Sequence, residues 1–204
     1  MAIPIMGTST DLLNPFLSRS CAALKSPPDP LAVHWHVVMG NEAADPDSCA
    51  SAIVLAAALD AALDDDAAVV VPLIPVPRDD FRLQLDRVHL LRRAGLAGEG
   101  EGPGWTPSAV AFADELDLSK LAASGRLHLH LVDHNALTSP FAALGPHVTS
   151  IIDHHADQVP SAFSKPTTAC GSCSCTRRLL PLSHVRALSR RRASTRRLSA
   201  RSAV

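Results

Sequence analysis

The chain has 204 residues, of which 47% are hydrophobic, so it can bury one real core, and a large multidomain enzyme is excluded. Its formal net charge of −1 conceals two unlike parts: residues 1–160 carry 9 basic and all 20 acidic side chains, whereas residues 161–204 carry 10 basic side chains and no acidic one. No window holds the ~18 uncharged apolar residues that a membrane-spanning helix needs, so we expect no membrane partner and, without a recognisable leader, a cytoplasmic location.

Apolar runs alternate with helical patterns from residue 32 onward, which is typical of a parallel sheet with crossover helices. The apolar runs predict five strands, at 32–39, 69–76, 109–113, 127–132 and 148–152. Helices are predicted at 47–63, 79–93 and 118–123, with a Gly- and Pro-rich turn region at 99–107. In the second of these helices, Phe81, Leu85, Val88 and Leu91 share one face at helical spacing.

These elements predict an α/β fold with a five-stranded parallel sheet in a Rossmann-like arrangement. We assign this domain to residues 31–159, after an N-terminal segment at 1–30 and before a tail at 160–204.

Four histidines alternate within two of the predicted strands. His34 and His36 lie in the first strand, and His128 and His130 lie in the fourth, so each pair shares one face of its strand. We interpret all four as packing residues with satisfied hydrogen bonds and not as metal ligands.

Polar clusters follow three of the predicted strands at the point where each strand ends. They read Gly-Asn-Glu-Ala-Ala-Asp-Pro-Asp-Ser at 40–48, Asp-His-Asn at 133–135 and Asp-His-His at 153–155. Open parallel sheets place their ligand sites at the carboxyl ends of the strands, so we expect these clusters to converge. Taken singly, Asp45 and Asp47 could merely cap a helix and Asp133 could end a strand. The Asp-His-His run has no such structural explanation.

Several carboxylates and two imidazoles at one sheet edge suit a pair of divalent metal ions, with Mn²⁺ or Mg²⁺ favoured by the carboxylates. Two ions ~3.5–4 Å apart can share a bridging carboxylate and activate a water molecule. Asp133 is our candidate for the bridge. Asp153 is placed to orient a ligand histidine through its second ring nitrogen, as carboxylates around metal sites commonly do.

The GNEAADPDS, LVDHN and IIDHH elements, in that order, resemble the first three motifs of the DHH phosphoesterase superfamily. Asn41, at a position where pyrophosphatases of the superfamily carry a metal-binding histidine, makes the chain similar to the exopolyphosphatase and prune-like branch. The resemblance implies a two-metal site that binds Mn²⁺ or Mg²⁺. It further implies metal ligands at Asp45, Asp47, Asp133 and His154, a phosphate contact at His155, and Asn41 beside one metal and the substrate.

By this resemblance we expect a metal-dependent hydrolase that releases terminal phosphate from inorganic polyphosphate. A cyclic-nucleotide phosphodiesterase and an oligonucleotide exonuclease of the same superfamily remain alternatives, as does a catalytically dead fragment that acts as an interaction protein. Members of the superfamily carry a fourth acidic motif and a second, basic domain. No Asp or Glu follows Asp157 in this chain, so we expect impaired activity.

The tail at 160–204 is rich in Ser and Arg and lacks the periodicity of the preceding domain. A basic arm for nucleic acid or an acidic partner, a disordered tail, and a misread exon or shifted reading frame are three interpretations. We rank the shifted frame first and nucleic-acid binding last.

Overall fold

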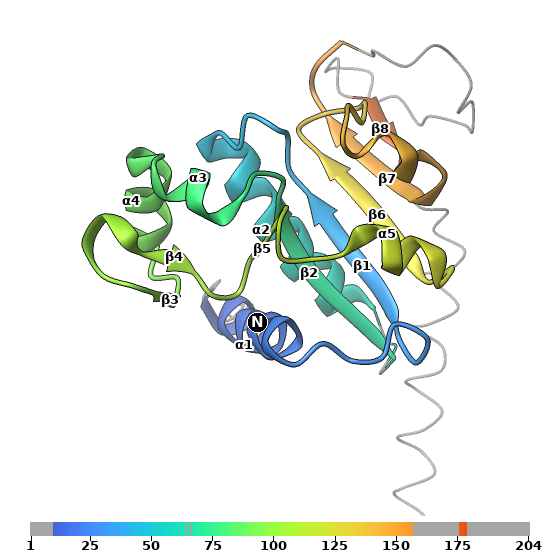
Figure 1. Cartoon of the computed structure of the whole chain (residues 1–204), viewed down its shortest axis with the longest axis horizontal. Helices are drawn as coiled ribbons and strands as arrows, with labels where there is room; N and C mark the ends of the chain where they lie inside the picture. The colour runs from blue at the N-terminus through green and yellow to red at the C-terminus, as the bar shows by residue number, and fades with distance from the viewer. Residues whose placement is uncertain (1–9, 64, 66, 157–175, 179–204) are drawn as a thin grey trace, which may run out of the picture.

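The structure, a computed structural model, describes residues 10–63, 65, 67–156 and 176–178 (Figure 1). Within these residues the main sheet has the strand order β5-β2-β1-β6-β7-β8. Its parallel strands are β1 (His34–Met39), β2 (Ala68–Ile74), β5 (Ala111–Phe112), β6 (Leu127–Val132) and β7 (Val148–Asp153). The predicted α/β class and its five-stranded parallel sheet are therefore confirmed. A separate antiparallel pair joins β3 (Gly98–Glu99) to β4 (Thr106–Pro107).

Helices cover both faces of the sheet. The helical elements are α1 (Thr10–Lys25), α2 (Pro46–Ala62), α3 (Arg78–Arg82), α4 (Leu85–Arg93), α5 (Leu118–Ala123) and the short 3₁₀ helices η1 (Gly102–Gly104) and η2 (Ala142–His147). α5 and η2 pack on one face and α1 and α2 on the other, as the shared core clusters show (Figure 1). None of the helices in the described part of the chain is long and apolar enough to cross a membrane.

The central strands are apolar on both faces because helices bury both faces. In β1, Trp35 and Val37 point into the core beneath α5, whereas Val38 points into the core beneath α2. All three side chains are at most 1% exposed. This burial on both sides explains why the strand sequence is a continuous apolar run and not an alternating one.

The helix predicted at 79–93 is wrong as a single element, because the chain breaks into α3 and α4 around Leu83 and Gln84. Phe81, Val88 and Leu91 are buried as predicted, but Leu85 is 57% exposed and Leu83 is 79% exposed. Because of this break, the predicted apolar residues keep their helical spacing in the sequence, but Leu85 faces solvent.

Several elements of the described chain lie outside the predicted strands and helices, among them α1 and β8. α1 falls within the N-terminal segment, and its Phe16 is 1% exposed in the core beneath α2. β8 (Thr176–Arg178) falls within the tail and pairs antiparallel with β7, a strand that the sequence did not predict. The rest of the tail, at 160–175 and 179–204, lies outside the described residues, so the prediction that it is disordered falls there too.

Candidate metal centre

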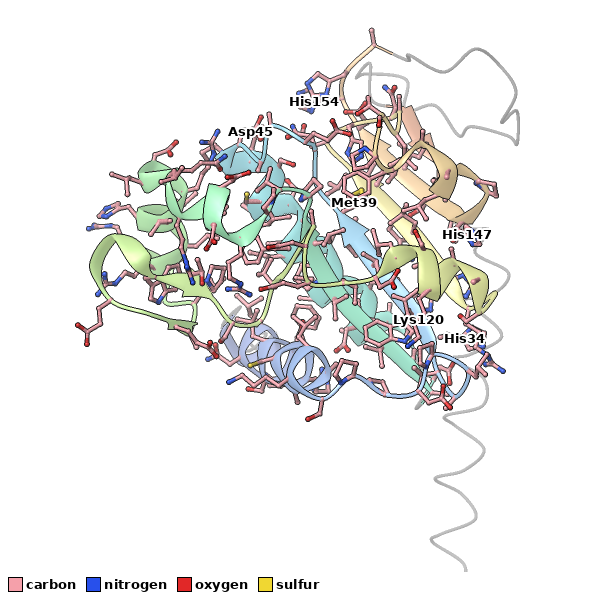
Figure 2. The ribbon with its side chains drawn as sticks, in the orientation of Figure 1. His34, Met39, Asp45, Lys120, His147 and His154 are labelled. Carbon is pink, nitrogen blue, oxygen red and sulfur yellow. The ribbon has the colours of Figure 1, made fainter. Side chains whose placement is uncertain are left out.

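The three polar clusters converge at one edge of the sheet. They follow β1, β6 and β7, which are neighbours in the strand order and run parallel. Figure 2 shows Asp45 and His154 at the end of the sheet where Met39 closes β1, whereas His34 lies at the opposite end. The chain therefore brings carboxylates and imidazoles from separate segments to the carboxyl ends of parallel strands, where such sheets bind ligands.

A tight turn carries the first cluster from β1 into α2. The backbone N–H of Asn41 donates to Ser48 Oγ at 2.6 Å. Asp45 caps α2 by accepting from the Ser48 N–H at 3.1 Å, and Pro46 follows at the first helical position, where proline is well tolerated. A Cβ on Gly40 would lie 2.6 Å from Ser48 Oγ, so glycine permits this close approach of strand and helix.

The side chain of Asn41 joins two of the predicted ligands. Its Nδ2 donates to Asp133 Oδ2 at 2.9 Å and to Asp45 Oδ2 at 3.3 Å. Its Oδ1 is buried without a hydrogen-bond partner. A buried amide oxygen without a partner is an acceptor that a cation could satisfy, and hard divalent cations prefer oxygen ligands of this kind.

Asp133 lies at the centre of the cluster. It is 7% exposed and has a φ of +64°, a left-handed conformation that aspartate adopts more readily than most residues. Its pKa is raised, first by burial and then by the negative charges of Asp47 and Asp45. The site thus gathers like charges that a bound cation would neutralise.

The environment of Asp45 favours its charged form. Burial alone would raise its pKa, but hydrogen bonds from the Ser48 N–H and the Asn41 amide, with smaller effects from Asp47 and Arg87, bring it below the ordinary value. Arg87 reaches this loop from α4 and donates to the Ala43 carbonyl at 3.4 Å. Asp45 is therefore held as a carboxylate that can act as a metal ligand.

Asp153 is held by its neighbours and not by solvent, because its side chain is fully buried. It accepts from Asn135 Nδ2 at 2.6 Å, from His155 Nδ1 at 2.7 Å and from the His155 backbone N–H at 3.2 Å. Burial opposes its ionisation, but the bonds from His155 outweigh this effect and lower its pKa. The carboxylate that we expected to orient a ligand histidine is thus hydrogen-bonded to His155, to which the resemblance assigns a phosphate contact.

The two imidazoles stack on each other beside Asp133. Their ring centroids are 4.2 Å apart. His154 Nδ1 lies 3.3 Å from Asp133 Oδ1, and His155 Nδ1 lies 3.8 Å from the same oxygen. Both side chains are about half exposed or more, so they line the open side of the cluster.

Two groups of side chains in the described residues have the spacing to hold a metal ion. One group consists of Asp45, Asp47 and Asp133, and the other of Asp133, Asp153, His154 and His155, with ligand atoms within 4.8 Å of one another in each group. Asp133 belongs to both groups. The donor set of carboxylates with imidazoles fits divalent ions such as Mn²⁺ or Mg²⁺.

A shallow cavity of about 170 Å³ opens beside this cluster. Its lining includes Asn41, Asp133, Asp153 and His155, together with His134 and Asn135, two members of the second polar cluster to which the sequence assigned no role. His134 Nδ1 is 3.0 Å from the Val132 carbonyl oxygen, which can only accept, so Nδ1 donates in this bond. The position of both residues directly after Asp133 was the available sequence signal.

Comparison with known proteins agrees with this geometry. The model of the "DHH family, N-terminal domain" matches residues 35–185. The chain belongs to the DHH family. Its three clusters are the motifs whose resemblance the sequence indicated, and the match extends over both candidate metal groups.

Curated relatives in the same family are named as exopolyphosphatases. The chain is 38% identical over 119 residues to "Exopolyphosphatase PRUNE1" from Bos taurus and 37% identical over 119 residues to that from Homo sapiens, which is 58% of this chain and 24% of each relative. It is 35% identical over 149 residues to a "Putative exopolyphosphatase" from Schizosaccharomyces pombe, covering 71% of this chain and 35% of the relative. The chain thus spans about a quarter to a third of these relatives.

Proposed function

We propose that this chain provides the metal-binding part of a phosphoanhydride hydrolase that releases terminal phosphate from inorganic polyphosphate. The names of the curated relatives support the substrate class, and the cluster at the ends of β1, β6 and β7 supports a metal-dependent reaction.

The observation that carries this proposal is the shared position of Asp133 between two candidate metal groups. In our assignment Asp45 and Asp47 would hold one ion, His154 would hold the other, and Asp133 would bridge both. When bound, such a pair of ions supplies an activated water and neutralises phosphoryl oxygens. The buried Oδ1 of Asn41, which has no hydrogen-bond partner, would be a further oxygen donor beside one ion and the substrate.

His155 would bind the phosphate that is released. Its Nδ1 hydrogen-bonds Asp153 Oδ1, and this bond raises the pKa of His155, so the cationic form persists to higher pH. Asp153, held in turn by Asn135, keeps the ring in place. His155 Nε2 is then free to donate to an anionic oxygen at the open side of the cluster.

Basic groups that could grip a long polyanion are few around this cluster. Among the described residues, Arg87 is the arginine whose contacts reach the loop of Asp45. We infer that the chain alone hydrolyses polyphosphate slowly and that groups outside the described residues supply most of the positive charge.

The test is Mn²⁺-dependent phosphate release from short polyphosphate by the full chain, by Asp133→Asn and by Asp79→Asn, whose side chain is 85% exposed on α3. A fourth protein would add the remaining length of the S. pombe relative. We expect slow release by the chain, faster release by the extended protein, loss in Asp133→Asn and no change in Asp79→Asn.

Cyclic nucleotides and short oligonucleotides serve as competing substrates in the same assay. Faster turnover of either one than of polyphosphate by the extended protein would assign the site to a phosphodiesterase. Absence of Mn²⁺ binding together with absence of turnover on every substrate would contradict the enzyme assignment and favour an interaction protein.

A further inference from the structure

Four histidines form a continuous ladder between β1 and β6, on the sheet face that also carries Val38 and Val132. His34 Nδ1 lies 3.1 Å from His128 Nε2, and His36 Nδ1 lies 3.1 Å from His130 Nε2. The His36 ring stacks on His128 with centroids 4.6 Å apart and on His130 with centroids 5.4 Å apart. The four rings therefore join the two central strands through side chains as well as through the backbone.

Arg126 fixes the proton positions at one end of the ladder. Its Nη1 lies 3.2 Å from His34 Nε2, and because a guanidinium only donates, that nitrogen must accept. The proton of a neutral His34 then sits on Nδ1 and is donated to His128 Nε2. His128 can accept this bond only while its Nε2 is unprotonated.

The other end of the ladder is buried. His130 is 2% exposed, and its Nδ1 is 2.7 Å from Ser150 Oγ on β7. An N–H···N bond between His36 and His130 requires one bare nitrogen, so full protonation of both rings would break it. The two rings lie between Val70 on β2 and Ser150 on β7 in the strand order, positions that offer no countercharge.

The charges around the ladder also disfavour imidazolium. Burial lowers the pKa of His36 to about 4 and that of His130 to about 3, with further lowering by the neighbouring ladder histidines. The pKa of His128 is lowered by burial, then by His34 and by His147 at the end of η2. Asp65 is the acidic group that opposes this effect at His36, and it does not outweigh burial.

We propose that the histidine ladder is an acid-sensitive latch, which holds β1 to β6 while its imidazoles are neutral and releases them when they are protonated. The latch joins the strands that end at the two halves of the metal centre. Asn41 follows β1 and Asp133 follows β6, and their side chains meet at 2.9 Å. Opening of the β1–β6 seam would therefore separate the loop of Asp45 from Asp133.

The sign of the effect follows from the lowered pKa values. The pKa values of His36 and His130 are lower in the folded chain than the ordinary 6.5. Unfolding therefore takes up protons as the pH falls below 6.5, and the folded chain loses stability from there towards pH 4. Between pH 7 and pH 5 the unfolding equilibrium constant should rise ~20-fold for each of His36 and His130.

The first test is urea unfolding of the full chain at pH 7 and pH 5, for the wild type, His36→Asn, His130→Asn and the control His89→Asn. His89 is exposed on α4, away from the ladder. Between pH 7 and pH 5, the unfolding constant of each ladder variant should rise ~20-fold less than that of the wild type. The rise in His89→Asn should equal that of the wild type. A pH dependence in both ladder variants equal to that of the wild type would overturn the latch.

The second test needs no variant and holds even if a ladder substitution prevents folding. Ring ¹⁵N and ¹H resonances of the wild-type chain should show His36 and His130 neutral down to pH 5 and His34 protonated on Nδ1. Hydrogen exchange at pH 5 should open β1 and β6 before β2. Titration of His36 and His130 above pH 6, or uniform opening of the sheet, would contradict the proposal.

Discussion

Gly40→Ala should damage both the fold and the metal centre, because the end of β1 and the start of α2 touch at this residue. An alanine Cβ there would lie 2.6 Å from Ser48 Oγ and 3.3 Å from the Ser48 carbonyl oxygen. Gly40 does not have a positive φ, so the backbone itself would tolerate alanine. The expected cost thus comes from contacts with Ser48 and not from backbone strain.

The magnitude follows from two losses and one gain. Crowding of a buried contact costs about 1–3 kcal/mol, and loss of the bond from the Asn41 N–H to a fully buried Ser48 costs about 1–3 kcal/mol more. Replacing glycine returns about 0.4–1 kcal/mol through the unfolded chain. Together these effects give a net destabilisation of about 1–6 kcal/mol.

Urea unfolding and Mn²⁺ titration of Gly40→Ala, Gly145→Ala and the double variant Gly40→Ala/Ser48→Ala would measure this effect. Gly145 is the matched control, since a Cβ there meets nothing within 4 Å. It should be neutral or slightly stabilising. The double variant removes the hydroxyl that clashes, so its loss should be smaller than the sum of the two single losses.

The reasoning would be refuted if Gly40→Ala unfolded at the same urea concentration as Gly145→Ala. Strict additivity of Gly40→Ala and Ser48→Ala would also refute it, because the crowding would then not involve the Ser48 hydroxyl.

Three further predictions concern the metal centre. Asp133→Asn should raise the urea midpoint of the metal-free chain at pH 7, because the raised pKa of Asp133 reflects burial and repulsion by neighbouring carboxylates. The same variant should abolish Mn²⁺ binding in calorimetry. Asp45→Asn should lose only one of two bound ions, and an equal loss in both variants would count against a bridging Asp133. Asn135→Ala should weaken tripolyphosphate binding by the Mn²⁺-loaded chain by freeing Asp153 and with it the ring of His155, and unchanged binding would show that Asp153 needs no such support. Tripolyphosphate binding by the Mn²⁺-loaded chain should weaken as pH rises through the raised pKa of His155, whereas a similar decline in His155→Gln would assign the effect to another group.

The parallel strands could be predicted because each is an apolar run that ends in a polar cluster. β6 has the predicted bounds, and β7 extends one residue further, to Asp153. The division between α3 and α4 could not be predicted, since Phe81, Val88 and Leu91 keep their helical spacing across the break. α1 was not predicted because it contains Pro15. Proline is rare inside helices, so its presence obscures the helical pattern.

The meeting of Asp45, Asp133 and His154 could be expected from the topology, because parallel strands end at one edge. The partner of Asp153 could not, because side-chain directions in the loop after β7 depend on local dihedral angles that carry no sequence signal. The histidines were correctly interpreted as hydrogen-bonded packing residues. Their ladder required knowing that β1 and β6 are neighbours, which periodicity within a strand does not reveal.

The position of β1 between β2 and β6 constrains the order in which the chain can assemble during its synthesis. β1 and β2 are made early, but Asn41 must wait for Asp133, which is 92 residues further along. At ~5–20 residues per second, the ribosome leaves one edge of β1 unpaired for several seconds. An open edge of that kind can pair with another chain. Neither candidate metal group could help at this stage, because both include Asp133, which follows β6, so chaperones that cover exposed strands are expected to matter first.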